Sequence, residues 1–96
     1  MIEMDIQIDP HTLERAEQRG ASEEEIRDVI ETGFLIPAKY RRVGKAKISE
    51  FNREWRGQYY QQKRVEVFYT IAGSSIVTVT VYVFYGQWEK EHASSV

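Results

Sequence analysis

Apolar side chains occupy every second position from Ile2 to Ile8, and polar residues lie between them. This period of two predicts a short strand with one buried face. Asp9 and Pro10 follow, and they suit the N-cap and the first position of a helix. We expect that helix to run to Arg19 and to end at Gly20, because glycine readily forms a left-handed C-terminal cap.

A second helix is predicted to begin at Ser22. Ser22 and Glu25 have the spacing of a capping box, and the acidic residues of the first turn favour the positive end of the helix dipole. Gly33 ends the helix. The apolar stripe of this helix, at helical spacing, comprises Ile26, Val29 and Ile30.

From Phe34 onward the pattern predicts strands and turns, and Pro37 indicates an edge or a bend. The expected segments are a weak strand at Ala46–Phe51, a loop at Asn52–Gly57, one long bent strand or two short ones at Gln58–Ala72, a turn at Gly73–Ser75 and a clear strand at Ile76–Tyr85. The fold class predicted is therefore α+β: a strand, two helices, then an antiparallel sheet of three to four strands, with the helices packed on one face.

The last hairpin predicts which side chains share a face, because a slip of one residue would move a whole set to the other side. The set expected beneath the helices comprises Val65, Val67, Tyr69, Ile71, Val77, Val79, Val81 and Val83. The opposite face then carries Glu66, Phe68, Thr70, Thr78, Thr80 and Tyr82. Since that second face mixes polar and aromatic side chains, it is a candidate working surface.

The length of 96 residues predicts a single domain over residues 1–88, with a frayed tail at 89–96. The chain has no cysteine, which excludes disulfides and cysteine nucleophiles and fits a reducing compartment. Its start lacks the pattern of a signal peptide, and its most apolar segment is about half as long as a membrane helix. We therefore expect a cytoplasmic protein with no membrane partner. The sequence does not predict an oligomeric state.

Charge is unevenly distributed along the chain. Residues 1–31 carry ten acids and three bases, a net of −7, whereas residues 32–64 carry nine bases and two acids, a net of +7. A polyanionic partner would meet the middle third. The alternative is that the two segments neutralise each other across the fold.

The first helix carries one candidate site. His11, Arg15 and Arg19 follow at intervals of four residues, so they form one ridge. His11 lies in the first turn, where backbone N–H groups attract anions and a neutral imidazole suits a general base. The alternative is that His11 is an ordinary surface residue and that the arginines pair with acids such as Glu14 or Glu31.

The basic middle third is also rich in aromatic residues, a combination typical of surfaces that hold phosphates and stack on unpaired RNA bases. Half-exposed strands with no ligand show the same mixture, so that alternative stays open. The cations that we select as candidate RNA contacts are Arg41, Arg42, Lys63 and Arg64.

Several common sites are missing from the sequence. It has no phosphate-binding glycine loop and no zinc-protease or serine-hydrolase motif. Its two histidines, His11 and His92, are far apart, so we expect no metal site and no cofactor.

Two stretches of the sequence are His11-x-x-x-Arg15-x-x-x-Arg19-Gly20-x-Ser22-x-Glu24-Glu25-Ile26 and Thr78-Val79-Thr80-Val81-Tyr82. Together they resemble a bacterial family, the domain of unknown function 4258, which is similar to the RelE/ParE-like and BrnT-like toxins of toxin–antitoxin systems. The resemblance covers roughly residues 5–85.

The resemblance implies a RelE-like or barnase-like fold and RNA cleavage without a metal, through attack of the ribose 2′-OH on the adjacent phosphate. By position, His11 would be the general base or acid, Arg15 would hold the phosphate, and Tyr82 would complete the catalytic set. Arg19 and Thr80 would contact the substrate. The partners implied are RNA, with or without a ribosome, and an inhibitor protein similar to an antitoxin.

Two further hypotheses compete with this one. The chain is then either a non-catalytic module that binds RNA or a protein through its basic face, or an interaction domain whose acidic helices are the contact surface. A histidine at the start of a helix favours the nuclease, because binding alone needs no titrating group.

Overall fold

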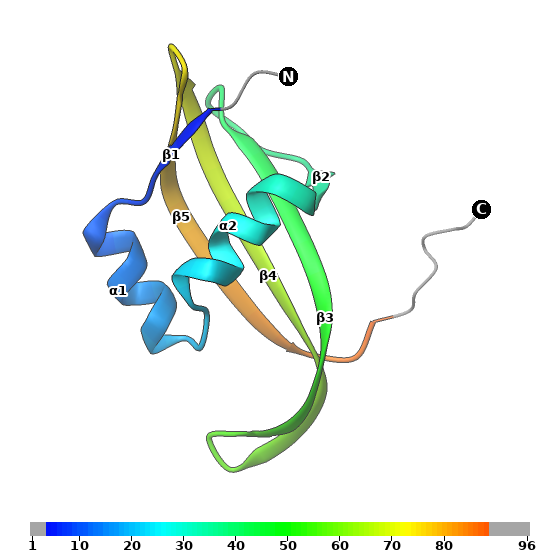
Figure 1. Cartoon of the computed structure of the whole chain (residues 1–96). Helices are drawn as coiled ribbons and strands as arrows, with labels where there is room; N and C mark the ends of the chain where they lie inside the picture. Colours follow the sequence, from blue (N-terminus) through cyan, green and yellow to red (C-terminus); the bar gives the residue numbers. More distant parts are fainter. Residues whose placement is uncertain (1–3, 89–96) are drawn as a thin grey trace, which may run out of the picture.

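Five strands form one sheet in the order β1-β5-β4-β3-β2, and two helices cover one of its faces (Figure 1). The computed structural model describes residues 4–88, so the predicted tail at 89–96, with His92, lies outside the described residues. The strands are β1 (Asp5–Gln7), β2 (Phe34–Ile36), β3 (Val43–Trp55), β4 (Gln58–Ala72) and β5 (Ser75–Gly86). The helices are α1 (Pro10–Gln18) and α2 (Glu23–Thr32).

The α+β class predicted from the sequence is confirmed, but the sheet is mixed. The four strands that follow the helices pair antiparallel, and β1 joins the sheet in parallel beside β5. The sheet therefore has five strands rather than three or four. Neither described helix has the length or the apolar character needed to cross a membrane.

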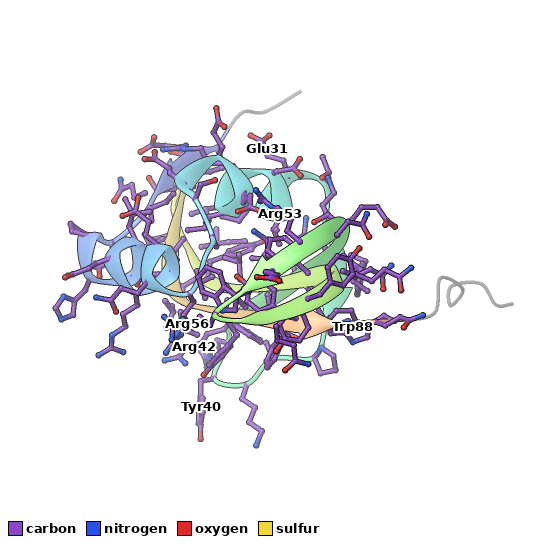
Figure 2. The ribbon with its side chains drawn as sticks, turned by 90° about the horizontal axis from the view of Figure 1, so that it is seen from below. Glu31, Tyr40, Arg42, Arg53, Arg56 and Trp88 are labelled. Atoms are coloured by element: carbon purple, nitrogen blue, oxygen red, sulfur yellow. The ribbon has the colours of Figure 1, made fainter. Side chains whose placement is uncertain are left out.

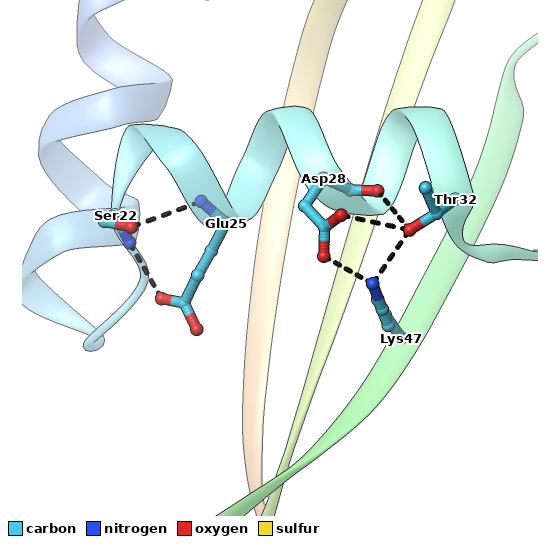
Figure 3. A network of polar contacts seen from close by, with 5 residues as sticks. All are labelled: Ser22, Glu25, Asp28, Thr32 and Lys47. Carbon is cyan, nitrogen blue, oxygen red and sulfur yellow. Dashed lines mark hydrogen bonds and ion pairs between the residues drawn. The ribbon is translucent and has the colours of Figure 1, made fainter.

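Both helices begin where their caps predict. The Asp9 carboxylate accepts a hydrogen bond of 3.1 Å from the backbone N–H of Thr12. Ser22 and Glu25 form a complete capping box, with reciprocal hydrogen bonds of 3.2 and 3.0 Å (Figure 3). Gly20 has a φ of +100°, which fits its predicted role after the first helix.

The core lies between the helices and the sheet. Ile26, Val29 and Ile30 are buried there, as the stripe on the second helix predicted. They belong to one apolar cluster with Val65, Val67 and Tyr69 of β4. Burial of this stripe, more than helix propensity, holds α2 against the sheet.

A β-bulge in β5 changes the predicted face of the last hairpin. Phe68 pairs with Thr80 but Tyr69 pairs with Thr78, so Val79 is an extra residue in β5. The extra residue reverses the alternation, and it places Thr78 under α1 with 4% of its surface exposed. The predicted faces of three residues were therefore wrong: Val77 and Val79 were expected beneath the helices and Thr78 on the opposite face.

At the far end of the hairpin, Ile71 was also predicted to be buried, but 54% of its surface is exposed. Val65, Val67, Tyr69 and Val81 are buried as expected, and Val83 packs against the same core as a partly buried residue.

The expected loop at Asn52–Gly57 was wrong, because β3 continues through most of it. A bulge near Asn52, with a φ of +51°, absorbs one residue and allows β3 to stay paired with β4 up to Trp55. Arg56 and Gly57 then form a two-residue turn in which both φ angles are positive. Gln58–Ala72 is one continuous strand.

Candidate functional site

A shallow cleft of about 170 Å³ lies between α1 and the edge of β5. It exists because β1 pairs with β5 only as far as Val77, so the edge of β5 from Thr78 onward faces α1 instead of another strand. The residues that line this cleft are Asp9, His11, Thr12, Arg15, Arg19, Val79, Thr80 and Val81.

Side chains of α1 satisfy the open edge of β5. The Thr12 hydroxyl donates to the carbonyl of Val79 at 3.3 Å, and the Arg19 guanidinium donates to the carbonyl of Val81 at 2.9 Å. These contacts replace the hydrogen bonds that a neighbouring strand would supply. Arg19 thus has a structural role in addition to its place in the cleft.

His11 and Arg15 are exposed residues of the same ridge, and both line the cleft. No ion pair among residues 4–88 involves Arg15 or Arg19, so the alternative in which they pair with Glu14 or Glu31 is not observed. Arg15 can therefore offer its guanidinium to an anion. A guanidinium fork matches the geometry of a phosphate.

Asp9 weakens the predicted attraction of anions to the N-terminus of the first helix. Its carboxylate already accepts the backbone N–H of Thr12 and lines the same cleft. A negative charge at this end repels a second anion. The backbone of the first turn is therefore a poor site for a further anion, and Arg15 lies one helical turn further from Asp9 than His11 does.

Tyr82 does not line the cleft. It pairs across the sheet with Glu66, on the face that the helices leave uncovered, and 43% of its surface is exposed. Thr80 pairs with Phe68 on that uncovered face and also lines the cleft, so it lies where the two surfaces meet. Of the predicted catalytic set, the cleft brings together His11 and Arg15 but not Tyr82.

Lys63 must be removed from the predicted RNA contacts. It is buried, with 6% of its surface exposed, and its ammonium contacts the Glu25 carboxylate at 2.7 Å and the Gly20 carbonyl at 2.8 Å. A buried cation that already has these partners is not available to a phosphate in solution.

The other three predicted cations lie at the surface or on the face of the sheet that the helices leave uncovered. Arg64 contacts Glu66 at 2.8 Å on the face without helices. Arg41 and Arg42 are exposed in the loop between β2 and β3. These three residues are outside the cleft lining.

The charge asymmetry is neutralised in part, because two ion pairs among the described residues, Lys47–Asp28 and Lys63–Glu25, join the basic middle third to the acidic α2. Lys47 contacts Asp28 on α2, and it also donates to Thr32 at 2.8 Å (Figure 3). The Lys47 ammonium and the Thr32 hydroxyl hold the pKa of Asp28 below its usual value. The acidic helix therefore uses part of the basic middle third to dock on the sheet.

An aromatic cluster, missed in the sequence, fixes the C-terminal end of α1. Tyr85 stacks on Trp55 with ring centroids 5.0 Å apart, and Phe51 and Tyr60 pack against the same ring. Arg56 at the hairpin tip donates to the carbonyl of Gln18 at 3.0 Å. The aromatic residues at 51–60 were the available signal, but they were interpreted as part of an RNA-binding surface.

The described residues 4–88 contain no cluster of three or more side chains of the types that ligate metals. In comparisons with known proteins, no family model, curated protein or solved structure matches this chain. The resemblance to the domain of unknown function 4258 thus stays a hypothesis that depends on the two motifs.

Proposed function

We propose that this chain is a toxin-like endoribonuclease that cleaves RNA without a metal. One observation carries the proposal: the cleft brings His11 and Arg15 of α1 together with Thr80 of β5, which is 65 positions or more away in the sequence. A titrating group, a cation and a hydroxyl in one cleft are the parts that phosphate chemistry needs.

In the proposed reaction, His11 removes the proton from a ribose 2′-OH. The 2′ oxygen forms a bond to the adjacent phosphorus, the bond from phosphorus to the 5′ oxygen breaks, and the leaving oxygen takes a proton from water. The hydroxide that remains takes the proton from protonated His11, which restores the neutral imidazole and the water molecule. The products are a 2′,3′-cyclic phosphate and a free 5′-OH. Arg15 stabilises the charge that develops on the phosphate oxygens, and Thr80 donates a hydrogen bond to one of them.

RNA, either free or on a ribosome, is the proposed substrate, and an inhibitor protein similar to an antitoxin would control the activity. A cleft this shallow encloses only a small part of a substrate. Contacts beyond the cleft must therefore select the RNA.

The test uses purified wild type and His11→Ala, each incubated with single-stranded RNA, with and without ribosomes and with a chelator. Cleavage by wild type, ends with cyclic phosphates, and a loss of about a hundredfold or more in His11→Ala would support the proposal. Intact RNA under all these conditions, or equal cleavage by His11→Ala, would reject it. The urea midpoint of each protein controls for folding.

A second candidate function is RNA binding without cleavage. The observation that favours it is the aromatic face of the sheet that no helix covers, where Tyr82 and Phe84 are 43% and 45% exposed. Binding that is independent of His11, without cleavage, would support this candidate.

A further inference from the structure

The face of the sheet opposite the helices is covered by no other element of the described chain (Figure 1). Cross-strand pairing places its side chains in five rows, and we call this surface the open face. The rows are Thr70 and Val77; Ile36, Gly44, Phe68 and Thr80; Phe34, Ala46, Glu66 and Tyr82; Ile48, Arg64 and Phe84; and Glu50, Gln62 and Gly86.

Aromatic rings run across the open face. Phe68 meets Tyr82 edge to face at 5.9 Å, and Tyr82 lies beside Phe84 at 6.3 Å. The Arg64 guanidinium lies over the ring of Phe34 at 5.5 Å. Three of these rings are exposed: 48% of Phe34, 43% of Tyr82 and 45% of Phe84. Exposed rings spread over several strands are an unusual use of surface for a sheet that only needs to fold.

The loop between β2 and β3 presents one more ring and three cations. Arg42 donates its backbone N–H to the carbonyl of Lys39 at 3.1 Å, which closes a tight turn around Tyr40 and Arg41. Both central residues have positive φ angles, 59° and 60°. Turns of this kind favour asparagine and glycine, so a tyrosine and an arginine here are strained. The strained turn displays Tyr40, which is 80% exposed.

This loop lies on the side of the open face. Figure 2 shows Tyr40 and Arg42 on one side of the sheet and Glu31, on α2, on the other. None of the ion pairs among residues 4–88 uses Lys39, Arg41 or Arg42. Of the two carboxylates on the open face, Glu66 is paired with Arg64, whereas Glu50, towards the β3–β4 hairpin, is exposed and accepts a hydrogen bond of 3.2 Å from Asn52. The open face thus has an excess of positive charge at its margin, while the helix layer is acidic.

We infer that the open face and the 39–42 loop bind single-stranded RNA, with the rings stacked on unpaired bases and the loop cations on phosphates. This inference deepens the proposed function and rests on it for the identity of the ligand. Thr80 connects the two surfaces, because it belongs to a row of the open face and lines the cleft. An RNA strand on the open face would pass the edge of β5 and bring one phosphate to Arg15.

Stacking and charge together favour RNA over an acidic protein. Exposed rings bind any unpaired base through its flat face, and cations at the margin attract the phosphates between bases. A duplex hides its bases and an acidic polypeptide has none, so neither would use the rings in this way. Both are therefore informative competitors.

The test measures binding of a ten-nucleotide, 2′-O-methylated RNA that contains 2-aminopurine. The blocked 2′ oxygen prevents the proposed cleavage, so wild-type protein can be used. Stacking of a ring on the base quenches its fluorescence. Phe34→Ala should weaken binding about fivefold or more and reduce the quenching. Leu35→Ala is the matched control: Leu35 is the next residue in β2 and 73% exposed, but it lies on the helix side of the sheet.

The cations are tested by charge reversal. Arg41→Glu should weaken binding and lower the salt dependence of affinity, by about 0.7 in the log–log slope for each phosphate that the protein no longer neutralises. Arg27→Glu makes the same change of charge on α2, and it should leave binding within about twofold. Urea midpoints confirm that each variant is folded.

Three results would overturn the inference: equal binding by wild type and Phe34→Ala, equal binding of a blunt RNA duplex, or equal binding of polyglutamate. The last of these would indicate an acidic protein as the partner. Cleavage is scored separately. Binding that depends on the rings, without any cleavage, would support this inference and reject the nuclease. Cleavage whose KM is the same in wild type and Phe34→Ala would support the nuclease and reject this inference.

Discussion

The Tyr85 hydroxyl donates a hydrogen bond of 2.7 Å to the backbone carbonyl of Arg19. The bond joins the last strand to the C-terminal end of α1, whose carbonyls have no partners within the helix. The ring of Tyr85 also packs on Trp55 from the β3–β4 hairpin. One residue thus ties three distant segments together at the end of the ridge that carries His11 and Arg15.

We expect Tyr85→Phe to lower the free energy of unfolding by about 0.5–1.5 kcal/mol, because the Arg19 carbonyl loses its partner while the ring packing stays. Urea denaturation at pH 7 measures this. Tyr59→Phe removes a more exposed hydroxyl, bonded to Asn52 at 3.2 Å, and should cost less. An equal cost for both variants would contradict a structural role for the Tyr85 hydroxyl.

The stabilisation that the hydrogen bond between Tyr85 and Arg19 provides should decrease at alkaline pH. Burial, followed by the charge of Glu25, raises the pKa of Tyr85 above 10.0, so the folded state favours the neutral hydroxyl. That stabilisation is complete below pH 10 and is lost as pH rises through the raised pKa. The difference in stability between wild type and Tyr85→Phe should therefore shrink above pH 10. Burial also raises the pKa of Tyr69, but that residue is present in both proteins.

Arg15 and Arg19 should separate chemistry from architecture. Arg15→Ala should leave the urea midpoint nearly unchanged and lower cleavage about a hundredfold, because the reacting phosphate loses its guanidinium partner. Arg19→Ala should lower stability by about 1–3 kcal/mol, because the Val81 carbonyl at the sheet edge loses a charged donor. If Arg15→Ala destabilises the protein as much as Arg19→Ala does, the assignment of these two roles is wrong.

Thr78 tests the bulge in β5. Its hydroxyl accepts the backbone N–H of Asp9 at 3.1 Å, beneath α1. Thr78→Val should cost about 1–3 kcal/mol, because it leaves that N–H without a partner in a part-buried site. Thr70→Val, on the neighbouring strand, should cost much less. Chemical denaturation of both variants measures the difference, and a neutral Thr78→Val would argue for the unbroken alternation predicted from the sequence.

The contact between Asp28 and Lys47 should weaken in acid. Because the Lys47 ammonium and the Thr32 hydroxyl lower the pKa of Asp28, its stabilisation is present above about pH 3.8 and is lost as pH falls through the lowered value. Asp28→Asn should be less stable than wild type at pH 7 and equally stable in strong acid. Urea unfolding at both pH values measures this, and an equal loss of stability in Asp28→Asn at pH 7 and in strong acid would contradict it.

Local signals in the sequence were sufficient for the helices. Ser22 and Glu25 mark a helix start through contacts within four residues, and Gly20 marks an end through its own backbone preference. The ridge of His11 and Arg15 follows from helical spacing alone. These features need no knowledge of the sheet, which is why they could be predicted.

Features set by distant contacts could not be predicted. The alternation from Val77 to Val83 gives no sign of a bulge at Val79, whose carbonyl accepts a hydrogen bond from Thr12, 67 positions away in the sequence. Lys63 looked like a surface cation until the fold placed Glu25 beside it. The residues on the α1 side of the cleft could therefore be predicted from the sequence, whereas those on the β5 side depend on the tertiary structure.

The parallel pairing of β1 with β5 determines when the cleft can form during synthesis. Asp5 pairs with Ser75, so about seventy further residues must be synthesised before β1 can pair with β5. Until β5 has been made, α1 has no strand edge to pack on, and His11 and Arg15 face no opposite wall. Contacts of such long range slow folding. A chain still in synthesis that lacks β5 would thus have no assembled cleft, and under the proposed function it could not cleave the RNA around it before β5 is in place.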